Sequence, residues 1–98
     1  MYDEGQGVAQ DYNEARSWYL KAAAQGNAPA QFNLGVMCAQ GQGAAPDVIE
    51  AHKWFALAAM QGYPNARKFQ DTLERKMTAA QMAESRRRVK EWHERSGR

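Results

Sequence analysis

The sequence has few of the residues that build covalent or metal-held frameworks. It contains one cysteine, Cys38, and two histidines, His52 and His93, among 98 residues. A lone cysteine excludes an intramolecular disulfide and any zinc site made of several cysteines. The histidines are far apart and lack the spacing of a metal site or a catalytic pair. We therefore predict no enzyme and no catalytic, metal-binding or cofactor-binding residues, with Cys38 as a buried hydrophobe and both histidines at the surface.

Long apolar stretches are lacking too. No run approaches the roughly 18 apolar residues of a membrane-spanning helix. The first residues, 1–5, lack the basic and apolar regions of a secretion signal, and the compartment is left open. Apolar residues make up 44% and charged residues 24%, which is ordinary for a globular chain that forms one domain.

When the sequence is shifted by 36 residues and compared with itself, two segments align. The matches are Gly5-Gln6-Gly7 with Gly41-Gln42-Gly43, Asp11 with Asp47, Glu14 with Glu50, Ala15 with Ala51, Trp18-Tyr19 with Trp54-Phe55, Ala22-Ala23 with Ala58-Ala59, and Gln25-Gly26 with Gln61-Gly62. Tryptophan and several glycines recurring at a single offset indicate an internal repeat.

The spacing of apolar residues predicts α-helices. Their expected ranges are about 12–24, 29–40, 48–60, 64–75 and 78–94. Asp11 and Asp47 stand where an N-cap carboxylate accepts from free amides. Gly26 and Gly62 stand where a left-handed residue ends a helix. Each repeat is therefore a helical hairpin.

Other residues refine this prediction. Pro29 and Pro64 suit the first turn of the helices that follow the glycines. Gly35 lies inside a helix, where glycine costs up to about 1 kcal/mol, so we expect a neighbouring helix to approach it closely. Thr78 and Gln81 have the form of a capping box.

These residues resemble the Sel1-like repeat. The stretches that carry the resemblance are Leu34-Gly35-Val36-Met37, Gly41-Gln42-Gly43, Asp47, Ala51-His52-Lys53-Trp54-Phe55 and Ala58-Ala59-Met60-Gln61-Gly62, with an earlier copy from Gly5 to Gly26. The resemblance covers about residues 1–69. It implies an all-α, right-handed α-α superhelix, a solenoid of about two and a half helical hairpins, that serves as an adaptor for protein complexes.

The expected organisation is a set of Sel1-like repeats over 1–77 and a C-terminal capping helix over 78–98. The repeats divide into a partial unit (1–26), a full unit (27–62) and a degenerate unit (63–77). Cys38 replaces a tyrosine of the family and Gln70 replaces a leucine, which makes the third unit degenerate.

In stacked hairpins the first helices of the units line a concave face, and we expect a protein or peptide of unknown identity to bind there, with no small-molecule substrate. Phe32 is left with two interpretations: contact with the partner or packing against the next such helix. The groove would run from an acidic side to a basic side, which suits an extended or helical peptide. Its predicted residues are Asp3, Glu4, Phe32, Asn33, Val36, Gln40, Lys68, Thr72 and Arg75.

Other functions remain open. The chain could be the targeting part of a larger effector or enzyme-accessory protein. The basic run 86–90 could bind nucleic acid or an anionic surface, although acidic residues interrupt it and no aromatic platform accompanies it. A solvated helix face and an acidic protein partner are its other interpretations. Trp18 and Tyr19 lie at the N-terminal end of the array, where we expect self-association.

Overall fold

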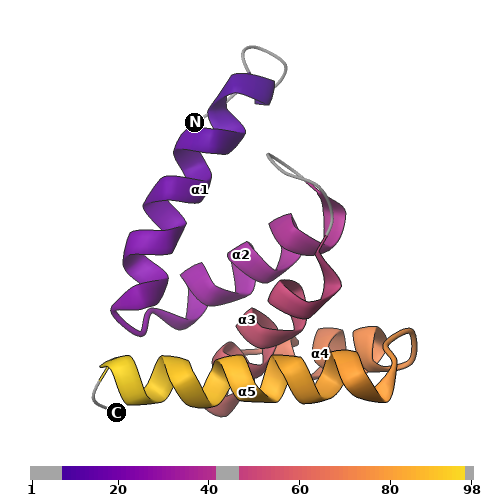
Figure 1. Ribbon diagram of the computed structural model, residues 1–98. Coiled ribbons are helices and arrows are strands. Elements are labelled where there is room, and N and C mark those ends of the chain that lie inside the picture. The colour runs from indigo at the N-terminus through magenta and orange to yellow at the C-terminus, as the bar shows by residue number, and fades with distance from the viewer. Residues whose placement is uncertain (1–7, 42–46, 97–98) are drawn as a thin grey trace.

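The computed structural model describes residues 8–41 and 47–96, with side chains over 14–41 and 47–95 (Figure 1). The described residues form five α-helices and no strand. The helices are α1 (Val8–Ala24), α2 (Ala28–Gln40), α3 (Val48–Met60), α4 (Ala66–Glu74) and α5 (Ala79–Ser96). The predicted all-α fold of helical hairpins is confirmed. Within the described part of the chain, no helix combines the length and apolarity needed to cross a bilayer.

The turns that end α1 and α3 carry the same backbone hydrogen bonds in both copies of the repeat. Gly26 (φ 91°) and Gly62 (φ 78°) adopt the predicted left-handed conformation. The amide after each glycine donates to a carbonyl in the last turn of the helix, at 3.1 Å in both cases. The donor and acceptor pairs are Asn27 with Ala22 and Tyr63 with Ala58. This is the Schellman arrangement, so the sequence repeat is also a repeat of backbone structure.

Helices α2 and α3 form the closest hairpin of the molecule. A Cβ atom added to Gly35 would lie 2.5 Å from Cε1 of Phe55, so the close approach predicted at this glycine is confirmed. Asp47 caps α3 as predicted, accepting from the Glu50 amide at 3.1 Å. The Asp47 amide also donates to the carbonyl of Cys38 at 2.9 Å, which ties the start of α3 to the end of α2.

Two predicted caps are wrong. Helix α1 already includes Val8, so Asp11 lies inside the helix and is not its N-cap. Pro64 precedes α4, whose N-cap is Asn65 with φ 68°. Because Asn65 stands between Pro64 and α4, the proline lies outside the first helical turn. Pro29, by contrast, does lie in the first turn of α2.

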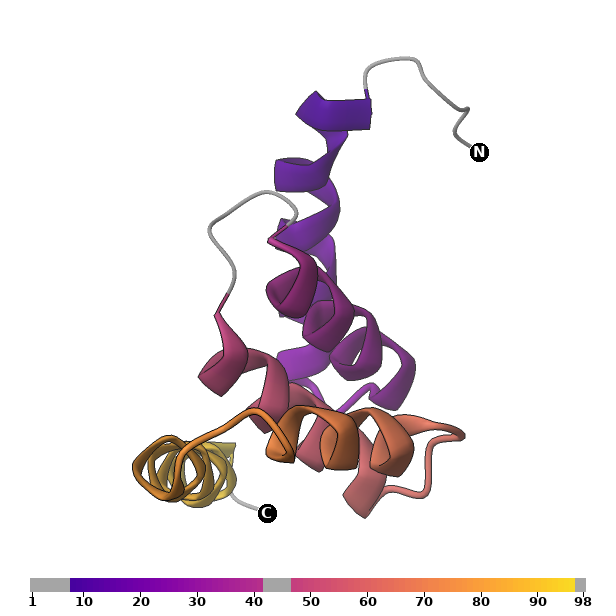
Figure 2. The same cartoon turned by 90° about the vertical axis from the view of Figure 1, so that its right-hand side faces the viewer.

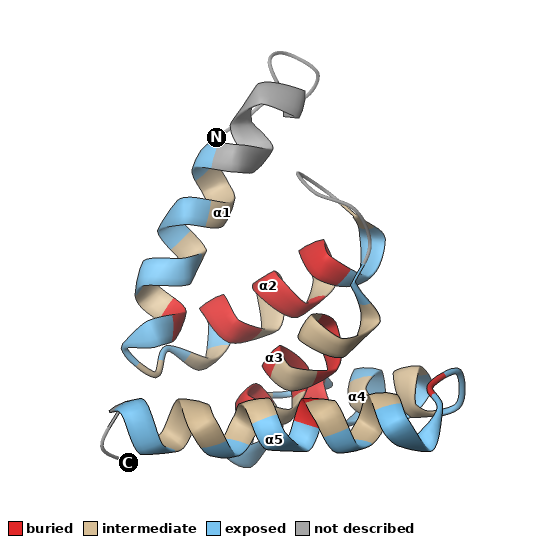
Figure 3. Ribbon diagram, viewed as in Figure 1, coloured by how far each residue is buried: buried red, intermediate tan, exposed pale blue. Residues whose placement is uncertain are grey.

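Helix α3 is the centre of the fold. It packs against α2, α4 and α5, whereas α1 packs chiefly against α2. Figure 3 shows that buried residues gather on α2 and α3. The largest core side chains are Leu34, Trp54, Phe55 and Leu57, with small alanines between the helices. Because apolar burial is the dominant favourable term in folding, the α2–α3 hairpin is the most stabilised part of the chain.

Helix α5 lies across the hairpin and packs mainly against α3, as Figures 1 and 2 show. We predicted a cap over the last unit, but the helix instead covers the second helix of the middle unit. Its start is the predicted capping box: the Gln81 amide donates to Thr78 Oγ1 at 3.1 Å, and Gln81 Oε1 accepts from the Thr78 amide at 2.9 Å.

Candidate protein-binding groove

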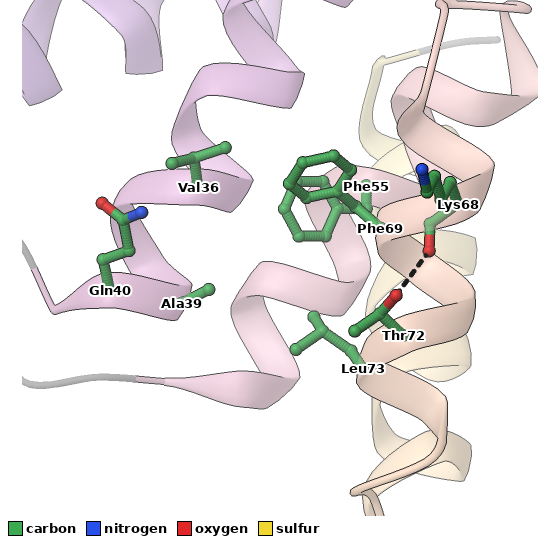
Figure 4. Close-up of a pocket in the computed structure, with 8 residues that line it drawn as sticks. All are labelled: Val36, Ala39, Gln40, Phe55, Lys68, Phe69, Thr72 and Leu73. Atoms are coloured by element: carbon green, nitrogen blue, oxygen red, sulfur yellow. Dashed lines mark hydrogen bonds between the residues drawn. The ribbon is translucent and has the colours of Figure 1, made fainter.

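An apolar groove of about 400 Å³ lies between α2 and α4, with α3 behind it (Figure 4). Three α2 residues line one side, four α4 residues line the other, and one α3 residue lies between them. The lining residues are Val36, Ala39, Gln40, Phe55, Lys68, Phe69, Thr72 and Leu73. Most of them are apolar, so the groove exposes surface that a partner can remove from water.

The groove takes its shape from a cluster of aromatic rings. The Phe55 ring is buried, whereas the Phe69 side chain is 40% exposed, and their ring centroids are 5.4 Å apart. Phe32 packs on both rings, with centroids 5.5 Å from Phe55 and 5.0 Å from Phe69. Tyr63 lies on the far side of Phe32 at 5.2 Å. Rings that contact one another in tilted and edge-on arrangements form a firm wall.

The four predicted residues that the structure brings together in the groove are Val36, Gln40, Lys68 and Thr72. Arg75 lies outside it, in a shallow depression on α4 that shares Lys68 and Thr72 with the groove. Of the two interpretations of Phe32, the structure supports packing: Phe32 contacts Phe69 of α4.

Asn33, another predicted residue, does not line the groove. Asn33 is half-buried on α2. Asp3 and Glu4 lie outside the described residues.

Our prediction missed four groove residues, Ala39, Phe55, Phe69 and Leu73. Phe69 is 40% exposed and Leu73 is half-buried on α4, so both side chains border the groove. Ala39 carries no sequence signal, since an alanine suits either a buried or an exposed helix position.

The prediction that His52 is a surface residue is wrong. Its side chain is 2% exposed. Nδ1 lies 2.7 Å from Ser85 Oγ of α5, and Nε2 lies 2.9 Å from Oε2 of Glu74 at the end of α4. The imidazole thus joins three helices. His93 is likewise half-buried rather than at the surface, and its ring stands edge-on to Trp92 at 5.2 Å.

The Ser85–His52–Glu74 set resembles the residue types of a hydrolytic triad, but its geometry is that of a buried link. Ser85 is 0% exposed, so a substrate has no path to its hydroxyl. The hydroxyl either donates to or accepts from the ring nitrogen, and the network is satisfied within the protein.

Cys38 is buried as predicted. Burial raises the pKa of its thiol, which lowers the thiolate fraction on which cysteine reactivity depends. Within the described part of the chain, no set of three histidine, cysteine or acidic side chains gathers as a metal site.

The basic run of α5 is partly neutralised by neighbouring carboxylates. Arg88 lies 2.8 Å from Glu50 of α3 and 2.9 Å from Glu84, and Arg87 bonds to Glu84 and Glu91. Hydrogen bonds from Arg87 and Arg88 hold the pKa of the Glu84 carboxyl below its usual range. The Arg88–Glu50 pair fastens α5 to α3, and all of these contacts reduce the positive charge available to a nucleic acid.

The fold and the groove define the protein as an array of α-helical hairpins with an apolar groove on one side. The Sel1 repeat model matches residues 1–27 and 28–63, and the chain belongs to this family. Repeats of this kind generally mediate protein–protein interactions and are typically non-catalytic. No curated protein and no solved structure matches the chain.

Proposed function

We propose that the chain is a protein-binding adaptor and that the groove between α2 and α4 holds an apolar side chain of a protein or peptide partner. The observation that supports this function most is the apolar groove lined by Phe55 and the partly exposed Phe69, in a family whose repeats bind proteins. The volume of about 400 Å³ falls within the range of ligand sites in proteins, about 300 to 1,000 Å³.

The size of the groove also limits the binding free energy that it can contribute. Burying one large apolar side chain contributes about 1.5 to 3 kcal/mol, which is less than the roughly 8 kcal/mol of a micromolar complex. A partner must therefore make further contacts beside the groove, and these contacts determine its specificity.

A binding experiment with a blocked groove tests this function. Peptides are selected from a displayed library on the full chain, and their affinity is measured by fluorescence anisotropy. Ala39→Trp fills the groove from an exposed helical position, and Ala83→Trp makes the same change at an exposed position of α5. We expect Ala39→Trp to weaken binding at least about tenfold, the equivalent of about 1.4 kcal/mol, and Ala83→Trp to leave it unchanged. Equal affinities for all three proteins would contradict the function.

Phe32→Ala is a poorer test, although Phe32 is one of the predicted groove residues. Its ring packs on Phe55, Tyr63 and Phe69, so the substitution damages the wall and the core together. A loss of binding in that variant would not separate recognition from stability.

Self-association is a second candidate, because Trp18 on α1 is 66% exposed and Leu20 is 41% exposed. Residues two apart on a helix point to different sides, so Trp18 is the exposed apolar side chain that a second copy would cover. If two copies meet through this end, light scattering will show a dimer that Trp18→Ala abolishes. A monomer at all concentrations would contradict this candidate.

A further inference from the structure

We infer that the partner of the groove is an acidic segment in which carboxylates flank one bulky apolar side chain. This inference rests on the proposed function and adds the chemistry of the partner. It is supported by the unequal charge of the two sides of the groove. The α2 side, with Val36, Ala39 and Gln40, is neutral, whereas the α4 side carries Lys68.

The carboxylates of α4 are already engaged elsewhere. Asp71 accepts from Arg67 at 3.4 Å, and Oε2 of Glu74 lies 2.9 Å from Nε2 of His52. Neither acid lines the groove, although Asp71 lines the depression beside it. Among the described residues Lys68 and Arg75 form no ion pair of their own, so this edge of α4 keeps its positive charge.

Lys68 and Arg75 lie beside the groove. The carboxylates of the partner must therefore lie beside the apolar side chain that enters the groove. Lys68 and Thr72 line both the groove and the adjoining depression, which also contains Arg67, Arg75 and one carboxylate, Asp71. The cations of the depression therefore outnumber its acid. A side chain seated against Phe69 therefore brings the neighbouring residues of its own chain over Lys68 and then Arg75. Carboxylates at those places gain favourable charge contacts, whereas lysines there meet like charges.

The basic run of α5 is a weaker candidate for the same partner. Arg87 and Arg88 are committed to Glu50, Glu84 and Glu91, and the crevice between α3 and α5 contains acids and bases side by side. The α4 edge joins exposed cations to an apolar groove, and that combination favours an acidic, apolar segment.

The described part of the chain itself presents a segment of related chemistry. Glu14 and Trp18 are both exposed and lie one helical turn apart on α1. A second copy could therefore compete for the groove, and the experiment must separate this occupant from a different protein.

Three fluorescein-labelled peptides provide the test. They share a central leucine and differ only in whether glutamate, glutamine or lysine flanks it. At low ionic strength we expect the glutamate peptide to bind roughly tenfold more tightly than the lysine peptide, because exposed ion pairs give small individual gains. The difference should shrink in 1 M salt, where the screening length is about 3 Å.

Charge reversal locates the effect on α4. Lys68→Glu should remove or invert the preference, whereas Lys90→Glu on α5 should preserve it; both lysines are exposed. If Ala39→Trp weakens all three peptides but their order does not follow charge, the inference is overturned and the proposed function stands. If Ala39→Trp has no effect on any peptide, the groove is not the binding site and both fail. A dimer abolished by both Trp18→Ala and Ala39→Trp would identify a second copy as the occupant and overturn the inference.

Discussion

Trp18 and Trp54 occupy the same position in two copies of one repeat, yet Trp18 is 66% exposed and Trp54 is 5% exposed. Both lie in the middle of a helix that ends in the same Schellman turn. The difference comes from the neighbours: α3 packs against α2, α4 and α5, whereas α1 packs chiefly against α2. The repeat specifies the helix and its turn, while the position in the array decides how much of the helix is buried.

Matched substitutions at the two tryptophans should give the largest difference in stability. Removing a buried tryptophan costs about 3 to 5 kcal/mol, so Trp54→Ala should lose a large part of the roughly 5 to 15 kcal/mol of a typical domain. Trp18→Ala should change the free energy of unfolding by no more than about 0.5 kcal/mol. Urea denaturation followed by circular dichroism measures both, and similar losses would contradict the comparison.

The next largest effect is expected at His52, whose counterpart in α1 is Arg16. His52→Ala leaves the buried Ser85 hydroxyl without its partner and leaves Glu74 only its contact with Gln70, which costs about 1 to 3 kcal/mol. Arg16→Ala should cost no more than about 0.5 kcal/mol. In a double-mutant cycle, Ser85→Ala should add less in the His52→Ala background than alone. Additive losses would show that the two side chains do not interact.

Gly35→Ala tests the close packing that distinguishes the α2–α3 hairpin. Alanine at a helix interior gains about 0.5 to 1 kcal/mol over glycine, but the added Cβ meets the Phe55 ring at 2.5 Å, and overpacking costs about 1 to 3 kcal/mol. We expect a net loss of about 1 kcal/mol in thermal denaturation. Phe55→Leu should reduce this loss by making room, and a more stable Gly35→Ala variant would contradict the contact.

The smallest effect is expected where α5 is fastened to α3. Arg88→Ala removes the contacts to Glu50 and Glu84 and should cost about 0.5 to 1 kcal/mol at low salt. Arg86→Ala, an exposed neighbour, is the control and should be neutral. Losses of the same size in both variants would mean that α5 is held by its apolar contacts alone.

The same ion pairs predict a dependence on pH. The pKa of Glu84 is lowered in the folded chain by Arg87 and Arg88, so its contribution is present at neutral pH. This contribution to stability begins to decrease as the pH falls below about 4, the usual pKa of a glutamate carboxyl. It is lost once the pH has fallen through the lowered pKa of the folded chain. Thermal melts should show that Arg88→Ala is destabilising at pH 7 and nearly neutral near pH 2.

Features set by local chemistry were predictable from the sequence. Gly26, Gly62, Thr78 and Asp47 act within a few residues of their place in the chain, and each was assigned correctly because cap and turn geometry is local. Gly35 was assigned correctly as well, since a glycine within a helix has few uses other than close packing.

Features set by distant partners were not predictable in the same way. His52 looked like a surface residue because its own helix places it beside Lys53, and its burial depends on Ser85 and Glu74 from two other helices. In the groove, helical periodicity pointed to faces of α2 and α4 that include Val36, Gln40, Lys68 and Thr72. It could not show that Phe69 stays 40% exposed, because that depends on what packs against α4.

The most direct test of the groove is to map the bound peptide by NMR on the labelled chain. Amide shifts should be largest at Ala39, Thr72 and Leu73 when a selected peptide is added, and the indole signal of Trp18 should stay in place. The opposite result, with the main shifts at Trp18 or along the basic run 86–90, would contradict the claim that this protein binds its partner between α2 and α4.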